Sequence, residues 1–150
     1  MTPTSAGTGW EEQHVTPDVA LGFWEYQMAT DDKDFLSAGT WPVLQAVSEW
    51  IESRAVSTTR GFEIRHIMGP DESVENVSNN SYMNVICRMV FEASVRCAQL
   101  VGVRPPDSWA KIARSIVLPV DQVRNVVLPY EHPPLDRAYS LGNMATLTTC

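Results

Sequence analysis

The strongest constraint on the fold is a long stripe of apolar residues at helical spacing near the middle of the chain. Its members recur every three or four positions within residues 80–101: Val85, Ile86, Met89, Val90, Ala93, Cys97 and Leu100. This spacing puts them on one face of an α-helix, which must be buried against other elements. We expect Ser78 to cap the helix and Gly102 to end it, because glycine readily adopts the left-handed conformation that follows a helix.

Two stretches before this helix also have the start signals of helices. Thr16-Pro17-Asp18 combines a cap residue, a proline at the first helical position and an acid in the first turn. The helix that it begins should end near residues 31–34. After a short turn at residues 35–39, Thr40 begins a second helix, which runs to about Arg54. The two helices form an antiparallel hairpin, and the sequence therefore predicts an all-α fold built from helical hairpins.

Residues 55–78 interrupt the helical pattern. Alternation at residues 61–68 predicts a short extended segment, which Gly69-Pro70 breaks. A connection of this length is usually functional or disordered, and this one is too rich in hydrophobic residues for disorder. Farther along, Ser108 should start another helix that Pro119 closes, and residues 126–128 should be briefly extended.

Composition and charge exclude several classes of protein. The chain has 150 residues, 44% of them hydrophobic and 19% charged, as expected of one folded domain. A net charge of −7 with 11 scattered lysines and arginines argues against a nucleic-acid partner. No window has the roughly 18 apolar residues of a membrane span. The first seven residues lack the features of a secretion signal, so we expect a cytoplasmic protein.

The cysteines and histidines predict neither a disulfide nor a metal site. Cys87 and Cys97 would lie roughly 15 Å apart along one helix, too far to share a bond or an ion. Together with Cys150 they are expected to be free thiols, mostly buried. The three histidines, at positions 14, 66 and 132, show no ligand spacing. We therefore expect no metal and no cofactor.

The densest group of chemically capable residues follows Gly69-Pro70. Asp71 and Glu72 are adjacent, so each makes the other harder to ionise, and partial burial would add to this effect. A carboxylic acid that stays protonated near neutral pH can donate a proton to a glycosidic oxygen. The nearby side chains Asn79, Asn80, Tyr82 and Asn84 could bind sugar hydroxyls. On physical grounds alone, a solvated turn followed by helix capping explains these residues better.

A family resemblance changes that balance. Residues 69–84 resemble the signature Gly-Pro-Asp-Glu-Tyr-His, then Val-Asp-Asn-Asn-Ala-Tyr-Thr-Asn, of glycoside hydrolase family 65. Residues 11–20 resemble its Glu-x-x-His-Val…Asp-Ile-Ala, residues 23–32 its Trp-x-Tyr…Thr-x-Asp, and residues 109–121 its Trp-x-x-x-Ala…Ile-Pro-x-Asp. The similarity thus runs in order from position 11 to position 121. The family includes maltose, trehalose and kojibiose phosphorylases, acid trehalases and related glucosidases.

The resemblance implies part of an (α/α)6 barrel that carries a long catalytic loop. It implies an enzyme that cleaves an α-linked glucosyl disaccharide or glucoside with inversion, with Glu72 as the general acid. Water is the nucleophile in the hydrolases, and inorganic phosphate is the co-substrate in the phosphorylases. We assign His14, Asp71 and Asn80 to substrate binding, although a capped, hydrogen-bonded structural histidine explains His14 equally well. A homodimer of the full-length protein is left open.

Three departures from the family pattern shape the final prediction. Ser73-Val74 replaces the usual Tyr-His, and the Lys-Gln pair that binds glucose is not visible in residues 139–143. The chain also lacks the family's Trp-Asp motif and its base or phosphate-binding loop. Residues 1–150 are therefore expected to be a partial catalytic domain, truncated at both ends and inactive alone. The departures favour hydrolysis slightly over phosphorolysis. The alternative is a non-catalytic sugar-binding helical module derived from the same family.

Overall fold

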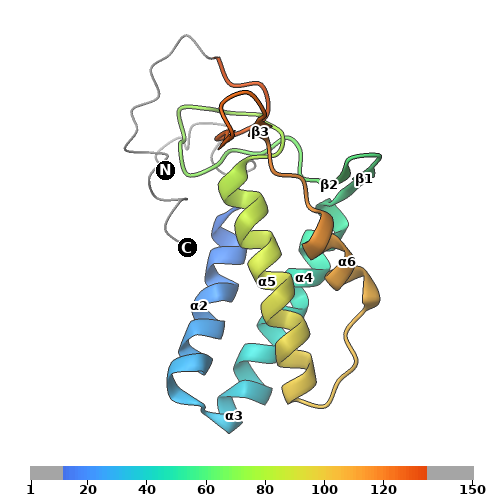
Figure 1. Cartoon of the computed structure of the whole chain (residues 1–150). Coiled ribbons are helices and arrows are strands. Elements are labelled where there is room, and N and C mark those ends of the chain that lie inside the picture. Colours follow the sequence, from blue (N-terminus) through green and yellow to red (C-terminus); the bar gives the residue numbers. More distant parts are fainter. Residues whose placement is uncertain (1–11, 135–150) are drawn as a thin grey trace.

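The computed structural model describes residues 12–134, and helices dominate this part of the chain. The longer helices are α2 (Val15–Thr30), α4 (Trp41–Arg54), α5 (Ser81–Leu100) and α6 (Asp107–Ser115). Each runs antiparallel to the one before it, so that α2 and α5 begin at the same end of the molecule (Figure 1). The prediction of a mainly helical chain built from hairpins is confirmed. No helix in residues 12–134 is long and apolar enough to cross a membrane.

The starts of α2 and α5 differ from the prediction. Helix α2 begins after His14, before the expected cap Thr16, because the Asp18 amide already donates to the His14 carbonyl at 3.1 Å. Helix α5 is capped by Asn80 instead of Ser78, since the Asn80 Oδ1 accepts a hydrogen bond from the Met83 amide at 3.0 Å. Its other end is as expected, with Gly102 in the left-handed region at φ 72°.

The predicted turn at residues 35–39 is helical instead. A short helix, α3 (Lys33–Phe35), continues into a π-helix, η1 (Leu36–Thr40), which leads directly into α4. The Phe35 ring stacks on Phe23 with a centroid distance of 5.6 Å and lies against the backbone of Gly39, where an added Cβ would come within 2.6 Å of it. Gly39 therefore makes room for an aromatic contact and does not end a helix.

Two small antiparallel hairpins accompany the helices. Strands β1 (Val56–Thr58) and β2 (Gly61–Glu63) form the first, and β3 (Val120–Asp121) and β4 (Val126–Val127) form the second. The extended segment predicted at residues 61–68 is confirmed as β2 and isolated bridges at Ile67 and Met68. Gly61 has φ 136°, and a Cβ there would lie 2.0 Å from the Ser115 carbonyl oxygen, so the first hairpin meets the end of α6 through a glycine.

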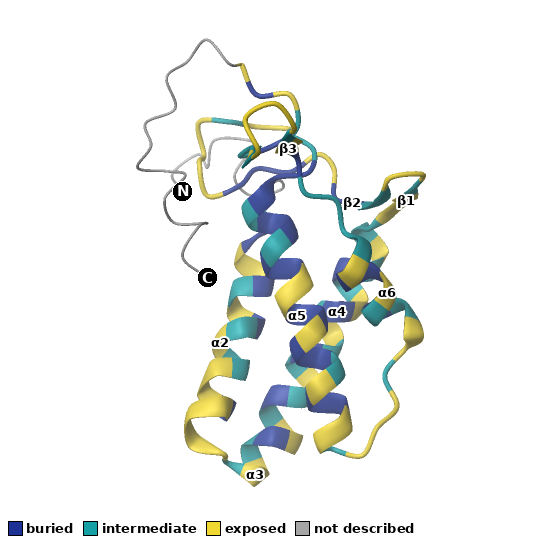
Figure 2. Ribbon diagram, viewed as in Figure 1, coloured by how far each residue is buried: buried dark blue, intermediate teal, exposed yellow. Residues whose placement is uncertain are grey.

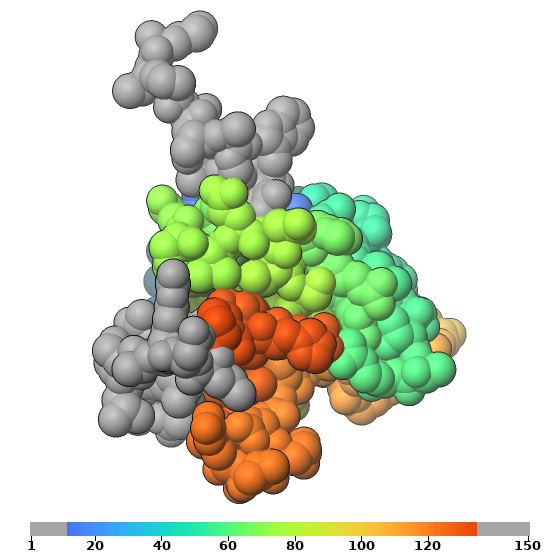
Figure 3. Space-filling view, turned by 90° about the horizontal axis from the view of Figure 1, so that it is seen from above, coloured from blue at the N-terminus to red at the C-terminus, as the bar shows by residue number. Residues whose placement is uncertain are grey.

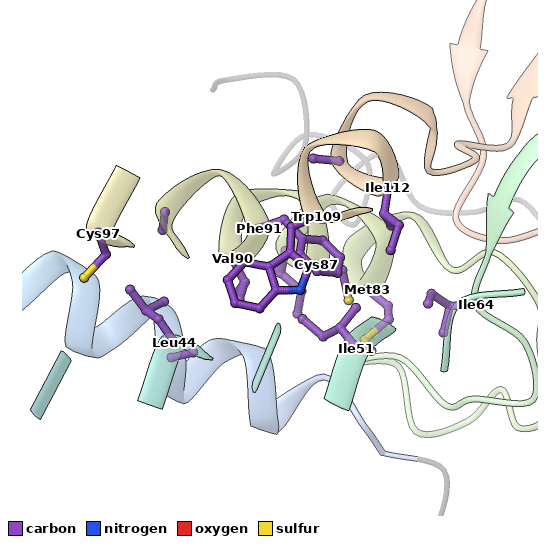
Figure 4. Close-up of a cluster of buried hydrophobic side chains, with 14 of the residues drawn as sticks. Leu44, Ile51, Ile64, Met83, Cys87, Val90, Phe91, Cys97, Trp109 and Ile112 are labelled. Atoms are coloured by element: carbon purple, nitrogen blue, oxygen red, sulfur yellow. The ribbon is translucent and has the colours of Figure 1, made fainter. Parts of the chain in front are cut away.

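The core lies between α4, α5 and α6. Figure 4 shows Phe91 and Trp109 at its centre, with Leu44 and Ile51 contributed by α4. Buried residues line the facing sides of these helices in Figure 2. Cys87 and Cys97 are buried and free, as predicted, whereas Cys150 lies outside the described residues. The helices thus form a packed scaffold that carries the long connection between β2 and α5 at one end.

Candidate active site

Backbone hydrogen bonds join the two ends of the connection between β2 and α5. Ile67 and Val77 exchange two backbone hydrogen bonds, at 3.1 and 2.9 Å, and the Asn79 amide donates to the Ile64 carbonyl at 2.8 Å. His66 and Asn76, which flank this pairing, both have left-handed backbones, at φ 56° and 54°. Their side chains are joined by a 2.8 Å hydrogen bond between Nδ1 and Oδ1. These contacts therefore fix both ends of the loop formed by residues 68–76.

Gly69, Pro70, Asp71 and Glu72 form the outer part of this loop. Gly69 is buried against Asn80, and a Cβ at Gly69 would lie 2.3 Å from the Asn80 Nδ2. The Asp71 Oδ1 accepts hydrogen bonds from the Ser73 amide at 3.1 Å and from the Ser73 hydroxyl at 2.5 Å. These contacts form a turn that places Glu72 on the surface, where no described residue bonds to its carboxylate. The partial burial considered for Glu72 is therefore not found within residues 12–134.

His14 lies at the same end of the molecule. Glu12 forms an isolated bridge with Met68, the residue before Gly69, and the His14 Nε2 is 3.8 Å from the Glu12 carboxylate. The His14 ring is buried against the edge of Tyr82, with ring centroids 5.9 Å apart. Its Nδ1 is buried and has no hydrogen-bond partner among the described residues. The structure thus brings His14 to the start of the loop that carries Glu72.

The other two predicted binding residues have structural contacts. Asn80 is buried, caps α5 and packs against Gly69, while the Asp71 carboxylate is hydrogen-bonded within its own turn. A cap of this kind stabilises a helix by about 1 kcal/mol. The assignment of His14, Asp71 and Asn80 to substrate binding stays a prediction.

A network of ion pairs and hydrogen bonds next to the loop was not predicted from the sequence. We call it the Glu63–Glu131 network, and it consists of Arg60, Glu63, Arg65, Asn79 and Glu131. The Glu63 carboxylate, 2% exposed, pairs with Arg60 at 2.7 Å and with Arg65 at 2.8 Å. Arg60 also pairs with Glu131, which accepts a 3.1 Å hydrogen bond from the Asn79 side chain. Close spacing of Arg60, Glu63 and Arg65 hints at their pairing, but no local pattern points to Glu131.

The network changes the titration of its buried carboxylate. Burial by itself raises the pKa of Glu63, but hydrogen bonds from Arg65, Arg60 and Thr58 outweigh it and lower the pKa to about 2. Glu63 is therefore ionised at neutral pH and cannot act as a general acid there. Its role in this chain is to hold the two arginines.

An open cleft of about 360 Å³ lies beside the network. It is lined by Arg60, Val117, Leu118, Pro119, Val120, Gln122, Leu128, Glu131 and His132. Figure 3, which looks down on this end, shows the molecule hollowed between the first hairpin and the segment that contains β3 and β4. Glu72 does not line the cleft. Within residues 12–134, no group of three or more His, Cys, Asp and Glu side chains is placed to hold a metal ion.

Comparison with known proteins decides the family. The family model "Glycosyl hydrolase family 65 central catalytic domain" matches residues 3–132. The chain belongs to glycosyl hydrolase family 65. The matched region contains every segment on which the resemblance was based, including the Gly-Pro-Asp-Glu turn, so the resemblance is confirmed.

Several members of family 65 are similar in sequence. A kojibiose hydrolase of Flavobacterium johnsoniae is 38% identical over 118 residues, which cover 78% of this chain and 17% of that protein. A protein-glucosylgalactosylhydroxylysine glucosidase of Dictyostelium discoideum is 34% identical over 128 residues, 82% of this chain and 18% of that protein. A kojibiose phosphorylase of Caldanaerobacter subterraneus is 30% identical over 138 residues, 86% of this chain and 18% of that protein.

A solved structure shares the fold. It is a human-microbiome protein named as a candidate kojibiose phosphorylase, with a TM-score of 0.64 and 18% identity. The match covers 77% of this chain and 18% of that one. The family 65 chain described here therefore spans less than a fifth of the length of these relatives.

Proposed function

We propose that the full-length protein cleaves α-glucosidic bonds with inversion and that Glu72 is its general acid. One observation carries the proposal: Glu72 lies exposed on a loop whose two ends are joined by backbone hydrogen bonds. It stands within the turn that resembles the catalytic signature of family 65. Glu72 protonates the glycosidic oxygen as the bond to the anomeric carbon breaks. Water or inorganic phosphate attacks that carbon from the opposite face, which inverts its configuration.

The geometry of the loop suits a proton donor. The Ile67–Val77 pairing and the Asp71–Ser73 turn hold the backbone on both sides of Glu72, while its side chain stays accessible to a ligand. His14 contributes to substrate binding from the neighbouring start of α2, because its buried Nδ1 is left without a partner in residues 12–134. Asp71 and Asn80 bind the substrate together with His14.

The proposed reaction is hydrolysis in preference to phosphorolysis. Ser73-Val74 departs from the Tyr-His of the family signature. A hydrolase and a glucosidase are among the proteins similar in sequence to this chain. A phosphorylase is among them too, and for that reaction phosphate is the co-substrate. In the hydrolase a second carboxylate outside this chain activates water, and no further cofactor takes part.

The chain is proposed to be one part of an (α/α)6 barrel domain. Val15, Val19 and Tyr26 on α2 are 50%, 52% and 47% exposed, although apolar residues of a helix are normally covered by neighbouring elements. Helices from the rest of the full-length protein would cover this face. The second carboxylate or the phosphate-binding loop would come from the same part, so the chain has no turnover alone.

The test compares wild type, Glu72→Gln and Glu75→Gln of the full-length protein. Release of glucose or glucose 1-phosphate is measured on a panel of α-linked glucobioses that includes kojibiose, with and without phosphate. We expect Glu72→Gln to lose about 10²-fold or more in kcat with folding intact, while Glu75→Gln, exposed in the same loop, stays close to wild type.

Each outcome has a distinct meaning. Dependence on phosphate identifies a phosphorylase, and the anomer first released, followed by NMR, reports inversion or retention. Unchanged activity of Glu72→Gln refutes its assignment as the acid. Sugar binding by the wild type without turnover on any substrate favours the non-catalytic module, which Ser73-Val74 also favours.

A further inference from the structure

Asn79 lies where the Glu72 loop joins α5, and its polar groups reach three separate segments. Its backbone amide donates to the Ile64 carbonyl at 2.8 Å, which ties the exit of the loop to its entry. Its Nδ2 donates to the Glu131 Oε2 at 3.1 Å, and its Oδ1 accepts from the Asn84 Nδ2 at 3.3 Å. The residue is fully buried. One side chain therefore connects the loop, the first turn of α5 and the segment near Glu131.

The backbone of Asn79 is as constrained as its side chain. Its φ is 53°, a left-handed conformation that asparagine tolerates better than other residues with a side chain. The conformation turns the chain from the loop into the helix. The direction in which the loop leaves α5 thus depends on this residue.

The partners of Asn79 are themselves held in place. The Ser81 amide donates to the Pro129 carbonyl at 2.9 Å and the Glu131 amide to the Ser78 carbonyl at 3.0 Å, so the segment before Glu131 lies alongside the start of α5. Figure 3 shows this red segment against the yellow-green loop. Asn84 also donates to the Val117 carbonyl at 2.6 Å.

Stability of the helix does not by itself require Asn79, because Asn80 supplies the cap of α5. A buried amide costs free energy unless it is hydrogen-bonded, and every bond of the Asn79 side chain is directed at fixing one segment against another. Its specific contribution is the geometry with which the loop is presented.

We propose that Asn79 is a positioning residue for Glu72. The inference rests on the proposed function, in which Glu72 is the general acid. Asn79 orients the loop relative to α5 and the segment around Glu131, and so sets where the Glu72 carboxyl meets the glycosidic oxygen. A proton donor must be held to within about 0.5 Å, and a misplacement of about 1 Å can cost about 10²-fold in rate.

The test uses two variants of the full-length protein. Asn79→Gly keeps the left-handed backbone and removes both side-chain bonds. Asn79→Asp keeps an acceptor for Asn84 and places a carboxylate oxygen against Glu131. Asn125→Gly is the matched control, since Asn125 is also left-handed at φ 53° but is exposed in the turn between β3 and β4. If Asn79→Gly does not fold, Asn79→Asp alone decides the outcome.

Two substrates separate positioning from a general structural role. An α-linked glucobiose needs a proton on its leaving oxygen, whereas α-glucosyl fluoride releases fluoride without one. We expect both Asn79 variants to lose about 10-fold or more in kcat on the disaccharide, with KM nearly unchanged, and to stay within about threefold of wild type on the fluoride. Glu72→Gln should show the same split in larger measure, and Asn125→Gly should show none.

The contrary results are distinguishable. An equal loss on both substrates means that Asn79 is merely structural, and no loss on either means that it is not needed; both overturn the inference. If Glu72→Gln keeps its activity on the disaccharide, the proposed function fails and this inference fails with it. If Glu72→Gln shows the split and the Asn79 variants do not, only the inference is overturned.

Discussion

The buried carboxylate of Glu63 should make the stability of the protein depend on pH in a calculable way. Its pKa is lowered from the ordinary 4.5 to about 2, because hydrogen bonds from Arg65 and Arg60 outweigh the effect of burial. The folded state therefore favours the ionised form, and its contribution is complete above pH 4.5 and lost as the pH falls towards 2. At 1.36 kcal/mol for each unit, the difference between the two pKa values corresponds to about 3 kcal/mol.

That magnitude is an upper bound. Arg60 and Arg65 are 53% and 42% exposed, so solvent screens their interaction with Glu63. The same linkage gives the course of the loss, which is about 1 kcal/mol by pH 4 and about 2 kcal/mol by pH 3.

The assay is denaturant unfolding of the full-length protein at pH 7, 4 and 3, with wild type, Glu63→Gln and Glu92→Gln compared at each pH. Differences between variants cancel the titration of groups that do not interact with Glu63. Glu63→Gln should be less stable by up to about 3 kcal/mol at pH 7, and the gap should narrow to about 1 kcal/mol or less at pH 3. Glu92 pairs with Arg88 on the surface of α5 and is 55% exposed, so its substitution should cost under about 1 kcal/mol at any pH.

Two results would refute the reasoning. A gap that does not change with pH would mean that Glu63 stabilises by packing and not by charge. No gap at pH 7 would mean that the arginines find equal partners elsewhere and that the network does not hold the loop.

Further predictions concern the scaffold, each measured by denaturant unfolding of the full-length protein. Trp109→Ala should cost about 3–5 kcal/mol, because Trp109 is 1% exposed and its Nε1 donates to Glu52 at 3.1 Å; a cost under about 1 kcal/mol would contradict its central place in the core. Gly61→Ala should destabilise strongly, since its Cβ would lie 2.0 Å from the Ser115 carbonyl oxygen at φ 136°. Gly22→Ala, in α2 with nothing within 4 Å, should stabilise by up to about 1 kcal/mol; equal effects at the two glycines would contradict both assignments.

The helices could be predicted because their signals are local. The apolar stripe that contains Val90 and Cys97 predicts α5, and Gly102 ends the helix in the left-handed conformation that glycine readily adopts. Two expected members of the buried stripe are wrong, because Met89 and Leu100 are 44% and 56% exposed. The failures occur where tertiary contacts compete with local signals. Gly39 resembles a helix breaker, but the Phe35 ring occupies the space that a side chain would need, and the chain remains helical through the π-helix.

The candidate site was predictable only in part. The turn that carries Glu72 and its family motif are contiguous in sequence, so both could be recognised. The Glu63–Glu131 network could not, because its ion pairs and hydrogen bonds join residues as far apart as Arg60 and Glu131. Nothing near Glu131 in the sequence indicates that it meets Asn79, since that contact depends on how the segment after β4 lies against α5.

The structural and functional interpretations of the asparagine-rich segment turn out to be compatible. Asn80 caps α5, as the structural interpretation predicts. The same side-chain amide packs against Gly69. Asn79 is buried for structural reasons, and its bonds join the two ends of the loop that presents Glu72. Under the proposal above, Asn79 sets the position of Glu72, while Asn80 caps the helix. Substitutions in this segment should therefore be judged by whether stability and catalysis change together or separately, since only a separate change in catalysis identifies a positioning residue.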